Sequence, residues 1–185
     1  MELQNHFLIA MPHLEDDHFY RSVVYICEHN EQGAMGLVLT QPTDLSIAEL
    51  CAKMNYMMQD NHHYPDQVVL AGGPVNLERG FILHTQTKNA FMHSYKVADN
   101  LYLTTSADVV DTFGTPEEPE KYLVTLGCAS WSPEQLEKEI ANNDWLIIPA
   151  SERLMFDVPC EDRWLEANLS LGIGIDNFTY QAGHC

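Results

Sequence analysis

The chain has 185 residues, of which 45% are hydrophobic, so it can enclose one sizeable core or two small ones, and its length favours a single domain. Nine lysines and arginines against 27 aspartates and glutamates give a formal net charge of -18. The mean field therefore repels phosphate backbones and anionic lipid surfaces, which argues against direct binding to nucleic acid or membranes. It also makes any local positive spot a place that a small anion can find.

Targeting, redox and metal signals are absent from the sequence. The start, MELQNHFLIAMPHLEDDHF, has no basic leader, and its apolar run at 7–11 is too short for a signal core or a membrane span, so we expect a cytoplasmic protein. The five cysteines are odd in number and form no CxxC pair, and the nine histidines show no HExxH or facial-triad spacing. We therefore expect free thiols, no metal and no cofactor.

Strand-like runs rich in β-branched and aromatic residues recur along the chain. They lie at 7–11, 22–28, 35–40, 67–71, 81–84, 95–97, 101–104, 122–126 and 145–148. Between the second and third runs, HNEQGA places Asn30 and Gly33 where a short hairpin needs positive φ. The first three strands are therefore predicted to be antiparallel neighbours.

Capping residues mark the predicted helices. Ser46 and Glu49 form a capping box ahead of one helix. In SPEQLEKEIANN, Ser132 is expected to cap, Pro133 to occupy the first helical position and Gln135 to reach back to the cap.

Two shorter helices are expected, from Ser106 to Gly114 and over 161–171. Strands and helices that intersperse without strict alternation indicate an α+β domain with a mixed sheet, which we place over residues 1–173. Residues 174–185 have few apolar anchors and are predicted to form a frayed tail.

The segment AGGPVNLERGFILH, residues 71–84, is the main candidate site. Gly72 and Gly73 follow an apolar strand, and consecutive glycines let backbone amides face a shared concavity in which Arg79 can hold an anion. The alternative is a wide hairpin whose arginine pairs with a nearby carboxylate. The segment is neither GxGxxG nor a Walker motif, so nucleotide hydrolysis is not supported.

A second candidate is the segment RSVVYICEHN. Strand alternation places Arg21, Cys27 and His29 on one face, and a cysteine two residues from a histidine is the minimum for a thiolate nucleophile with a base. The alternative is that Cys27 is a small buried hydrophobe. A third candidate is Ser106 in TTSAD, where a helix N-terminus favours anions unless the serine is simply the cap. No GxSxG elbow is present.

Four segments resemble, in order from residue 7 to about 173, those that define the bacterial YqgE/AlgH family: HFLIAMP, RSVVYICEHNEQGAMGLVLTQP, GGPVNLERGFILH and LGCASWSPEQLEKEIANNDWL. The resemblance implies a compact α+β domain with a branched, partly barrel-like sheet flanked by helices, in a cytosolic bacterial protein. It implies no activity. The matched positions that are polar or special in backbone are Arg21, His29, Gly72, Gly73, Pro74, Arg79, Gly80 and Ser106.

Three functional hypotheses follow from the sequence. The leading one is a non-enzymatic binding or regulatory module in which the glycine loop, with Arg21 and Arg79 meeting beside it, holds a small anion or a partner's carboxylate. The second is a thiol-dependent enzyme that uses Cys27 with His29. The third is a structural adaptor that contacts another protein through exposed aromatic residues such as Tyr56 or Phe91.

Overall fold

The computed structural model describes residues 2–54 and 64–172. The predicted tail at 174–185 and Tyr56 lie outside the described residues. The chain forms two compact units, which are described separately: unit 1 comprises Met1–Thr40 with Ser130–Cys185, and unit 2 comprises Gln41–Ala129. The single-domain extent over 1–173 stays a prediction. No helix among the described residues combines the length and the apolar character that crossing a membrane requires.

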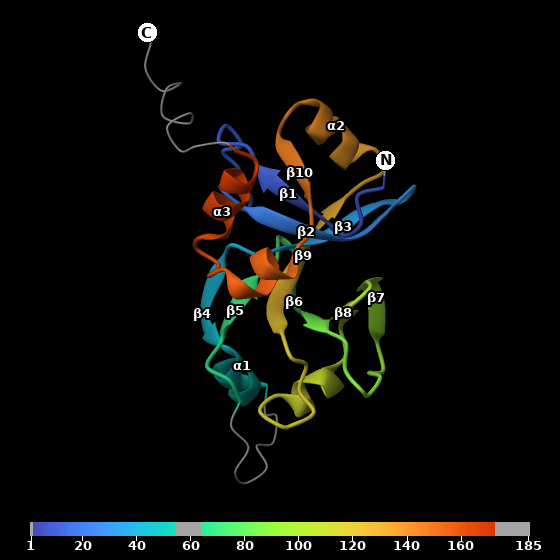
Figure 1. Cartoon of the computed structure of the whole chain (residues 1–185), viewed down its shortest axis with the longest axis vertical. Coiled ribbons are helices and arrows are strands. Elements are labelled where there is room, and N and C mark those ends of the chain that lie inside the picture. Colours follow the sequence, from blue (N-terminus) through green and yellow to red (C-terminus); the bar gives the residue numbers. More distant parts are fainter. Residues whose placement is uncertain (1, 55–63, 173–185) are drawn as a thin grey trace. The chain divides into compact units, whose positions relative to one another are not determined.

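Unit 1 is built on four antiparallel strands in the order β10-β1-β2-β3. Their bounds are β1 His6–Ala10, β2 Val23–Asn30, β3 Gly33–Val38 and β10 Trp145–Pro149. Its helices are α2 Gln135–Ala141, the π-helical turn η2 Arg153–Asp157 and α3 Arg163–Ser170. In Figure 1, α3 (red) lies beside β1 (blue).

The predicted hairpin between the second and third strands is confirmed. Asn30 pairs with Gly33 at its closed end, and Gly33 has φ +124°. A Cβ at Gly33 would lie 2.1 Å from the carbonyl oxygen of Trp131, so the tight approach of the two backbones also requires glycine. Asn30 does not adopt the positive φ expected of it; its side chain instead accepts a hydrogen bond from the Gln32 amide at 2.8 Å.

The helix expected from Pro133 begins two residues later than predicted. Glu134 has φ 63°, a left-handed conformation that cannot continue a helix, so α2 starts at Gln135. Ser132 therefore makes no side-chain cap. The expected return of Gln135 does form, because its side-chain oxygen accepts from the Ser132 amide at 3.0 Å.

An aromatic cluster around one carboxylate joins α2 to the core of unit 1. Phe19 stacks on Trp131 with ring centroids 6.0 Å apart and meets Trp145 edge-on at 5.4 Å. Both indole Nε1–H groups donate to the same oxygen of Glu139, Oε2, at 2.9 Å. Since both indole side chains are buried, this carboxylate satisfies two donors that have no access to bulk water.

Unit 2 carries a mixed, branched sheet. Strands β9, β6, β8 and β7 are antiparallel neighbours in that order, while β5 pairs with β9 in parallel and with β4 in antiparallel orientation. Their bounds are β4 Pro42–Ser46, β5 Val68–Ala71, β6 Val75–Thr85, β7 Ser94–Ala98, β8 Leu101–Thr104 and β9 Tyr122–Trp131, whose last two residues belong to unit 1. The predicted α+β class and mixed sheet are confirmed.

Strand β4 was not predicted from the sequence. Its residues, PTDLS, combine proline and aspartate, which are depleted in strands, and its pairing with β5 is irregular. The strand forms because Pro42 and Ser46 meet Leu70 and Val68 across a register shift. Tertiary pairing thus overrides a weak local preference.

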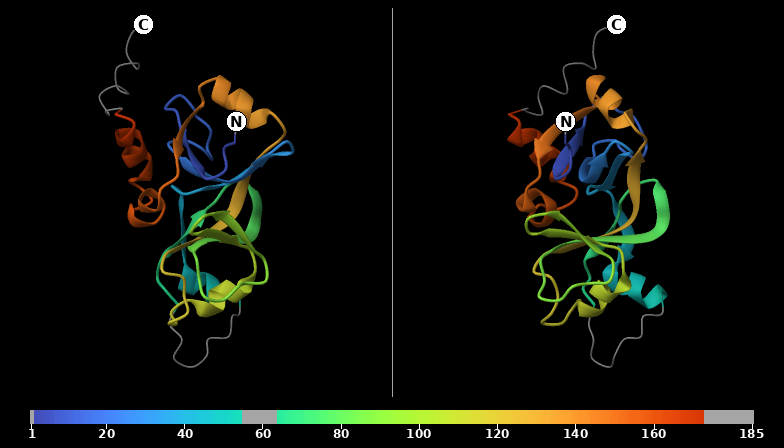
Figure 2. Two further views of the ribbon diagram at one scale, coloured as in Figure 1. Left: turned by 45° about the vertical axis from the view of Figure 1, so that its right-hand side comes forward. Right: turned by 90° about the vertical axis from the view of Figure 1, so that its right-hand side faces the viewer.

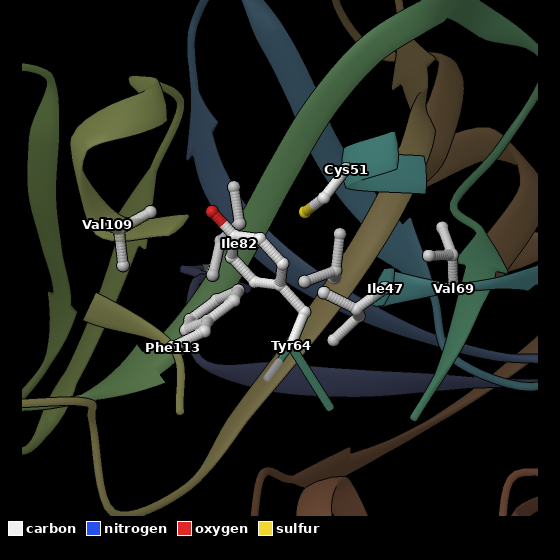
Figure 3. Close-up of a cluster of buried hydrophobic side chains, with 8 residues drawn as sticks. Ile47, Cys51, Tyr64, Val69, Ile82, Val109 and Phe113 are labelled. Carbon is white, nitrogen blue, oxygen red and sulfur yellow. The ribbon is translucent and has the colours of Figure 1, made fainter. Parts of the chain in front are cut away.

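The helix α1, Ile47–Lys53, and the 3₁₀ turn η1, Ala107–Thr112, enclose the core of unit 2. The capping box of Ser46 and Glu49 is confirmed, with the Glu49 amide donating to Ser46 Oγ at 3.1 Å. Figure 2 shows α1 (teal) next to η1 (yellow-green) in both views. The buried cluster between them contains Ile47, Cys51, Tyr64, Val69, Ile82, Val109, Phe113 and Val124, most of which are labelled in Figure 3.

Candidate functional site

The paired glycines lie between β5 and β6 and pack directly on the backbone of β9. The Gly72 amide donates to the carbonyl of Leu126 at 2.8 Å, so it does not face an anion. A Cβ at Gly72 would lie 2.3 Å from the Gly127 oxygen, and one at Gly73, where φ is +148°, 2.3 Å from the carbonyl of Cys128. Close approach of two main chains therefore accounts for both glycines.

After Pro74, the first half of β6 is exposed and irregular. Val75 pairs with Cys128 and Gly80 with Leu126, and the register shifts between these two pairs. Residues 75–79 are all exposed, so they present side chains to solvent while the second half of β6 is buried.

Arg79 lies at the end of this exposed run. Its guanidinium lies 5.5 Å from the ring centroid of Phe81, and its Nη2 donates to Thr105 Oγ1 at 3.4 Å. Within residues 2–54 and 64–172 it forms no ion pair with a carboxylate. The alternative predicted from the sequence, in which Arg79 pairs with a nearby carboxylate, is therefore not found among the described residues.

A mostly apolar cavity of about 110 Å³ adjoins Arg79, because Thr105, the hydrogen-bond partner of Arg79, is one of its lining residues. Gly80, Ser106 and Glu78 also line this cavity. The remaining lining comes from α1, β6, η1 with the residues beside it, and β9: Ile47, Leu50, Cys51, Met54, Ile82, Ala107, Val110, Phe113, Val124 and Leu126. Two predicted site residues, Gly80 and Ser106, thus meet at one hollow.

Ser106 is engaged in a local network. Its Oγ donates to Asp108 Oδ1 at 2.5 Å and accepts from the His93 amide at 3.0 Å, and it makes no side-chain cap on η1. Burial alone would raise the pKa of Asp108, but hydrogen bonds from Ser106 and from the Met92 amide hold that pKa below its usual value. A charged carboxylate beside Ser106 disfavours an anion at that serine, so Ser106 shapes the cavity wall instead.

Cys27 and His29 do not form a nucleophile and base pair. A register shift between Ile26 and Glu28 places a bulge at Cys27, which interrupts the predicted alternation of faces. His29 uses both ring nitrogens elsewhere: Nδ1 lies 3.2 Å from the donating amide of Leu3, and Nε2 lies 2.7 Å from Glu137 Oε1. Cys27 itself is buried, as the alternative reading of the sequence expects.

Arg21 precedes β2 rather than lying on it, so its predicted place on the strand face is wrong. It adopts φ 46°, and its guanidinium lies 5.3 Å from the ring centroids of both Tyr20 and Trp164. Arg21 belongs to unit 1 and Arg79 to unit 2, which are described separately. Their meeting in one site stays a prediction.

Sequence reasoning missed the wall that α1 supplies. Ile47, Leu50, Cys51 and Met54 recur at the i, i+3, i+4, i+7 spacing of one helix face, which is the signal that could have found it. Thr105 belongs to the TTSAD segment, in which no sequence signal distinguishes it from the neighbouring serine. Phe91, proposed as an adaptor contact, is half-buried with its ring edge-on to His84 at 5.4 Å.

Residues 7–176 match a family model described as AlgH-like. The chain belongs to the AlgH-like family. It is 72% identical over 185 residues to the UPF0301 protein PM1869 of Pasteurella multocida, with all of both chains covered. It is also 60% identical over 185 residues to a UPF0301 protein of Haemophilus influenzae, strain PittEE, covering all of this chain and 99% of that one.

Two solved structures resemble this AlgH-like chain. The solution structure of the AlgH protein from Pseudomonas aeruginosa superposes with a TM-score of 0.78 at 39% identity, covering 100% of this chain and 97% of that one. The crystal structure of DIP2367 from Corynebacterium diphtheriae gives 0.71 at 23% identity over 90% and 86% of the two chains, which shows the fold alone. The family resemblance drawn from the four sequence segments is therefore confirmed.

Proposed function

We propose that this AlgH-like chain is a binding module that holds a carboxylate with a short apolar tail, as a small molecule or as part of a partner protein, without transforming it at that site. The observation that carries the proposal is Arg79, which has no carboxylate partner among the described residues and adjoins an apolar cavity in a chain of net charge -18. Such binding suits the regulatory role expected from the sequence. The cytoplasmic location is likewise a proposal from sequence.

The proposed ligand follows from the two parts of the site. The guanidinium offers a planar fork that matches a carboxylate, and the cavity that Thr105 helps to line offers apolar side chains from α1, β6 and β9. Roughly four buried methylenes contribute about 3 kcal/mol, and an exposed charge pair contributes about 1 kcal/mol. A sum of about 4 kcal/mol corresponds to a Kd of about 1 mM.

Affinity in this range is measured by NMR titration of the ¹⁵N-labelled full chain with hexanoate. We expect saturable shifts at the amides of Gly80, Thr105 and Ala107, and a loss of affinity of about fivefold in the Arg79→Gln variant. Lys96→Gln is the matched control, because Lys96 is another exposed cation of unit 2, paired with Asp99 at 3.8 Å and absent from the cavity.

Titration with hexanol tests binding to the apolar cavity without the charge interaction at Arg79. Hexanol lacks the charge, so it should bind the original protein and Arg79→Gln equally. Absence of saturable shifts with hexanoate, or equal hexanoate affinity in the original protein and Arg79→Gln, contradicts the proposal.

A further inference from the structure

Three hydrogen-bonded side chains of unit 2 lie on three neighbouring strands. His84 on β6 lies with Nε2 2.7 Å from Thr104 Oγ1 on β8, and Thr104 Oγ1 lies 2.8 Å from Ser94 Oγ on β7. Ser94 and Thr104 are direct partners across β7 and β8, so their side chains share a face of the sheet. His84 and Thr104 are buried, whereas Ser94 is partly exposed.

The hydrogen bond of His84 Nδ1 determines which group donates at each step from His84 to Ser94. His84 Nδ1 lies 2.8 Å from the carbonyl oxygen of Thr85, which can only accept, so Nδ1 carries a hydrogen. Burial lowers the pKa of His84, which keeps the ring neutral and leaves Nε2 as an acceptor. The single hydroxyl hydrogen of Thr104 is then used on Nε2, and Ser94 must donate to Thr104.

Ser94, the last of these three side chains, lines a cavity of about 280 Å³. The cavity is lined by His84, Ser94, Tyr102 and the segment 86–91, whereas Thr104 is buried and does not line it. Tyr102 stacks on His84 with centroids 6.0 Å apart, which gives the cavity an aromatic wall. The volume is close to the lower bound for small-molecule sites.

Two potential oxyanion donors line the same cavity. The Gln86 side-chain amide and the Lys88 ammonium have no hydrogen-bond or ion-pair partner in the described part of the chain. Groups of this kind can stabilise the negative oxygen of a tetrahedral intermediate. The cavity therefore holds a hydroxyl whose proton points toward a neutral histidine, with donors along its wall.

We propose that Ser94 is a nucleophile that takes an acyl group from a small ester bound in this cavity. As the Ser94 Oγ bonds to the acyl carbon, its proton moves to Thr104 Oγ and the Thr104 proton moves to His84 Nε2. As the bond to the leaving oxygen breaks, His84 Nε2 returns its proton to Thr104 Oγ, and Thr104 gives its own proton to the leaving oxygen, which departs as the alcohol. Water then attacks the acyl-serine through the same relay, so ester and water yield acid and alcohol.

The roles of the three residues differ. Ser94 is the catalytic residue because it bonds to the substrate. Thr104 transfers the proton from Ser94, and His84 accepts it as the base. This cavity shares no lining residue with the cavity beside Arg79, because its lining comes from His84 on β6, Ser94 on β7, Tyr102 on β8 and the segment 86–91. The proposal does not depend on the carboxylate site, and either can fail alone.

The test uses the full chain with a fluorophosphonate probe, which traps nucleophilic serines, and with p-nitrophenyl butyrate as an ester. We expect mass spectrometry to place one adduct on Ser94, absent in Ser94→Ala. Thr104→Val should slow labelling at least tenfold, and Thr104→Ser, which restores the hydroxyl, should recover most of the rate. Ser132→Ala, at an exposed serine of unit 1, should react like the original protein.

The pH profile provides a readout that a structural hydrogen-bond network would not move. Burial holds the pKa of His84 below its ordinary value of about 6.5, so the ring is neutral at every pH above that value. The labelling rate should therefore be flat from pH 8 to about 6.5. No adduct on Ser94, or an unchanged rate in a Thr104→Val protein that retains its NMR spectrum, would overturn the proposal.

Discussion

Replacing Glu139 tests how unit 1 holds its aromatic cluster. Both buried indoles, Trp131 and Trp145, donate to one oxygen of this carboxylate, Oε2, at 2.9 Å. Glu139→Ala leaves both N–H groups without an acceptor, and each unsatisfied buried donor costs about 1–3 kcal/mol, or roughly 2–6 kcal/mol together. Glu139→Gln keeps an oxygen that can accept from both, so it should cost only about 1 kcal/mol, the part due to charge.

Urea unfolding followed by tryptophan fluorescence measures these differences, because all three tryptophans belong to unit 1. The loss in Glu139→Ala should lower the Tm by about 4–24 °C at roughly 2–4 °C per kcal/mol. Glu134→Ala is the matched control on the same segment, since its pair with Lys138 is exposed and weak. If Glu139→Ala and Glu139→Gln unfold at the same urea concentration, the shared acceptor does not stabilise the cluster.

Three further predictions concern unit 2 and the thiols. Gly73→Ala should lower the unfolding free energy by more than about 2 kcal/mol, as its Cβ would meet the backbone of β9, while Gly80→Ala, with no atom within 4 Å, should change it by less than about 1 kcal/mol; equal urea midpoints would contradict this. Because burial lowers the folded-state pKa of His84, the unfolded chain binds this proton first, so stability should fall below about pH 6.5. Urea midpoints at pH 7.5 and 5.5 should converge in His84→Gln, and an unchanged difference would refute the assignment. Burial raises the pKa of both thiols, that of Cys51 to about 11, but Cys160 is the more exposed of the two, so iodoacetamide at pH 8 should modify Cys160 before Cys51, and peptide mapping that shows the reverse order would refute it.

Much of the fold could be predicted because its signals are local. Side-chain alternation and β-branched composition indicated nine of the strands, the capping box located α1, and Gly33 identified the first hairpin. These signals depend on residues within a few positions of one another, so no long-range information is needed to read them.

The candidate site could be predicted only in part. The segment that contains Arg79 was predicted as a site from its glycines, but these are explained by β9, more than fifty residues later in the chain. Likewise, the pairing of His29 with Glu137 depends on where α2 lies, which a sequence pattern around His29 cannot indicate.

The sequence by itself determined the α+β class, the family, the acidic charge and the order of the elements, because composition, periodicity and capping act over a turn or a strand. Only the tertiary structure decided which side chains meet. The bulge at Cys27 separates it from the expected base, and the register of β6, β8 and β7 brings His84, Thr104 and Ser94 into one hydrogen-bonded chain. Register is set by the packing of distant strands, and a shift of one residue turns every side chain to the other face.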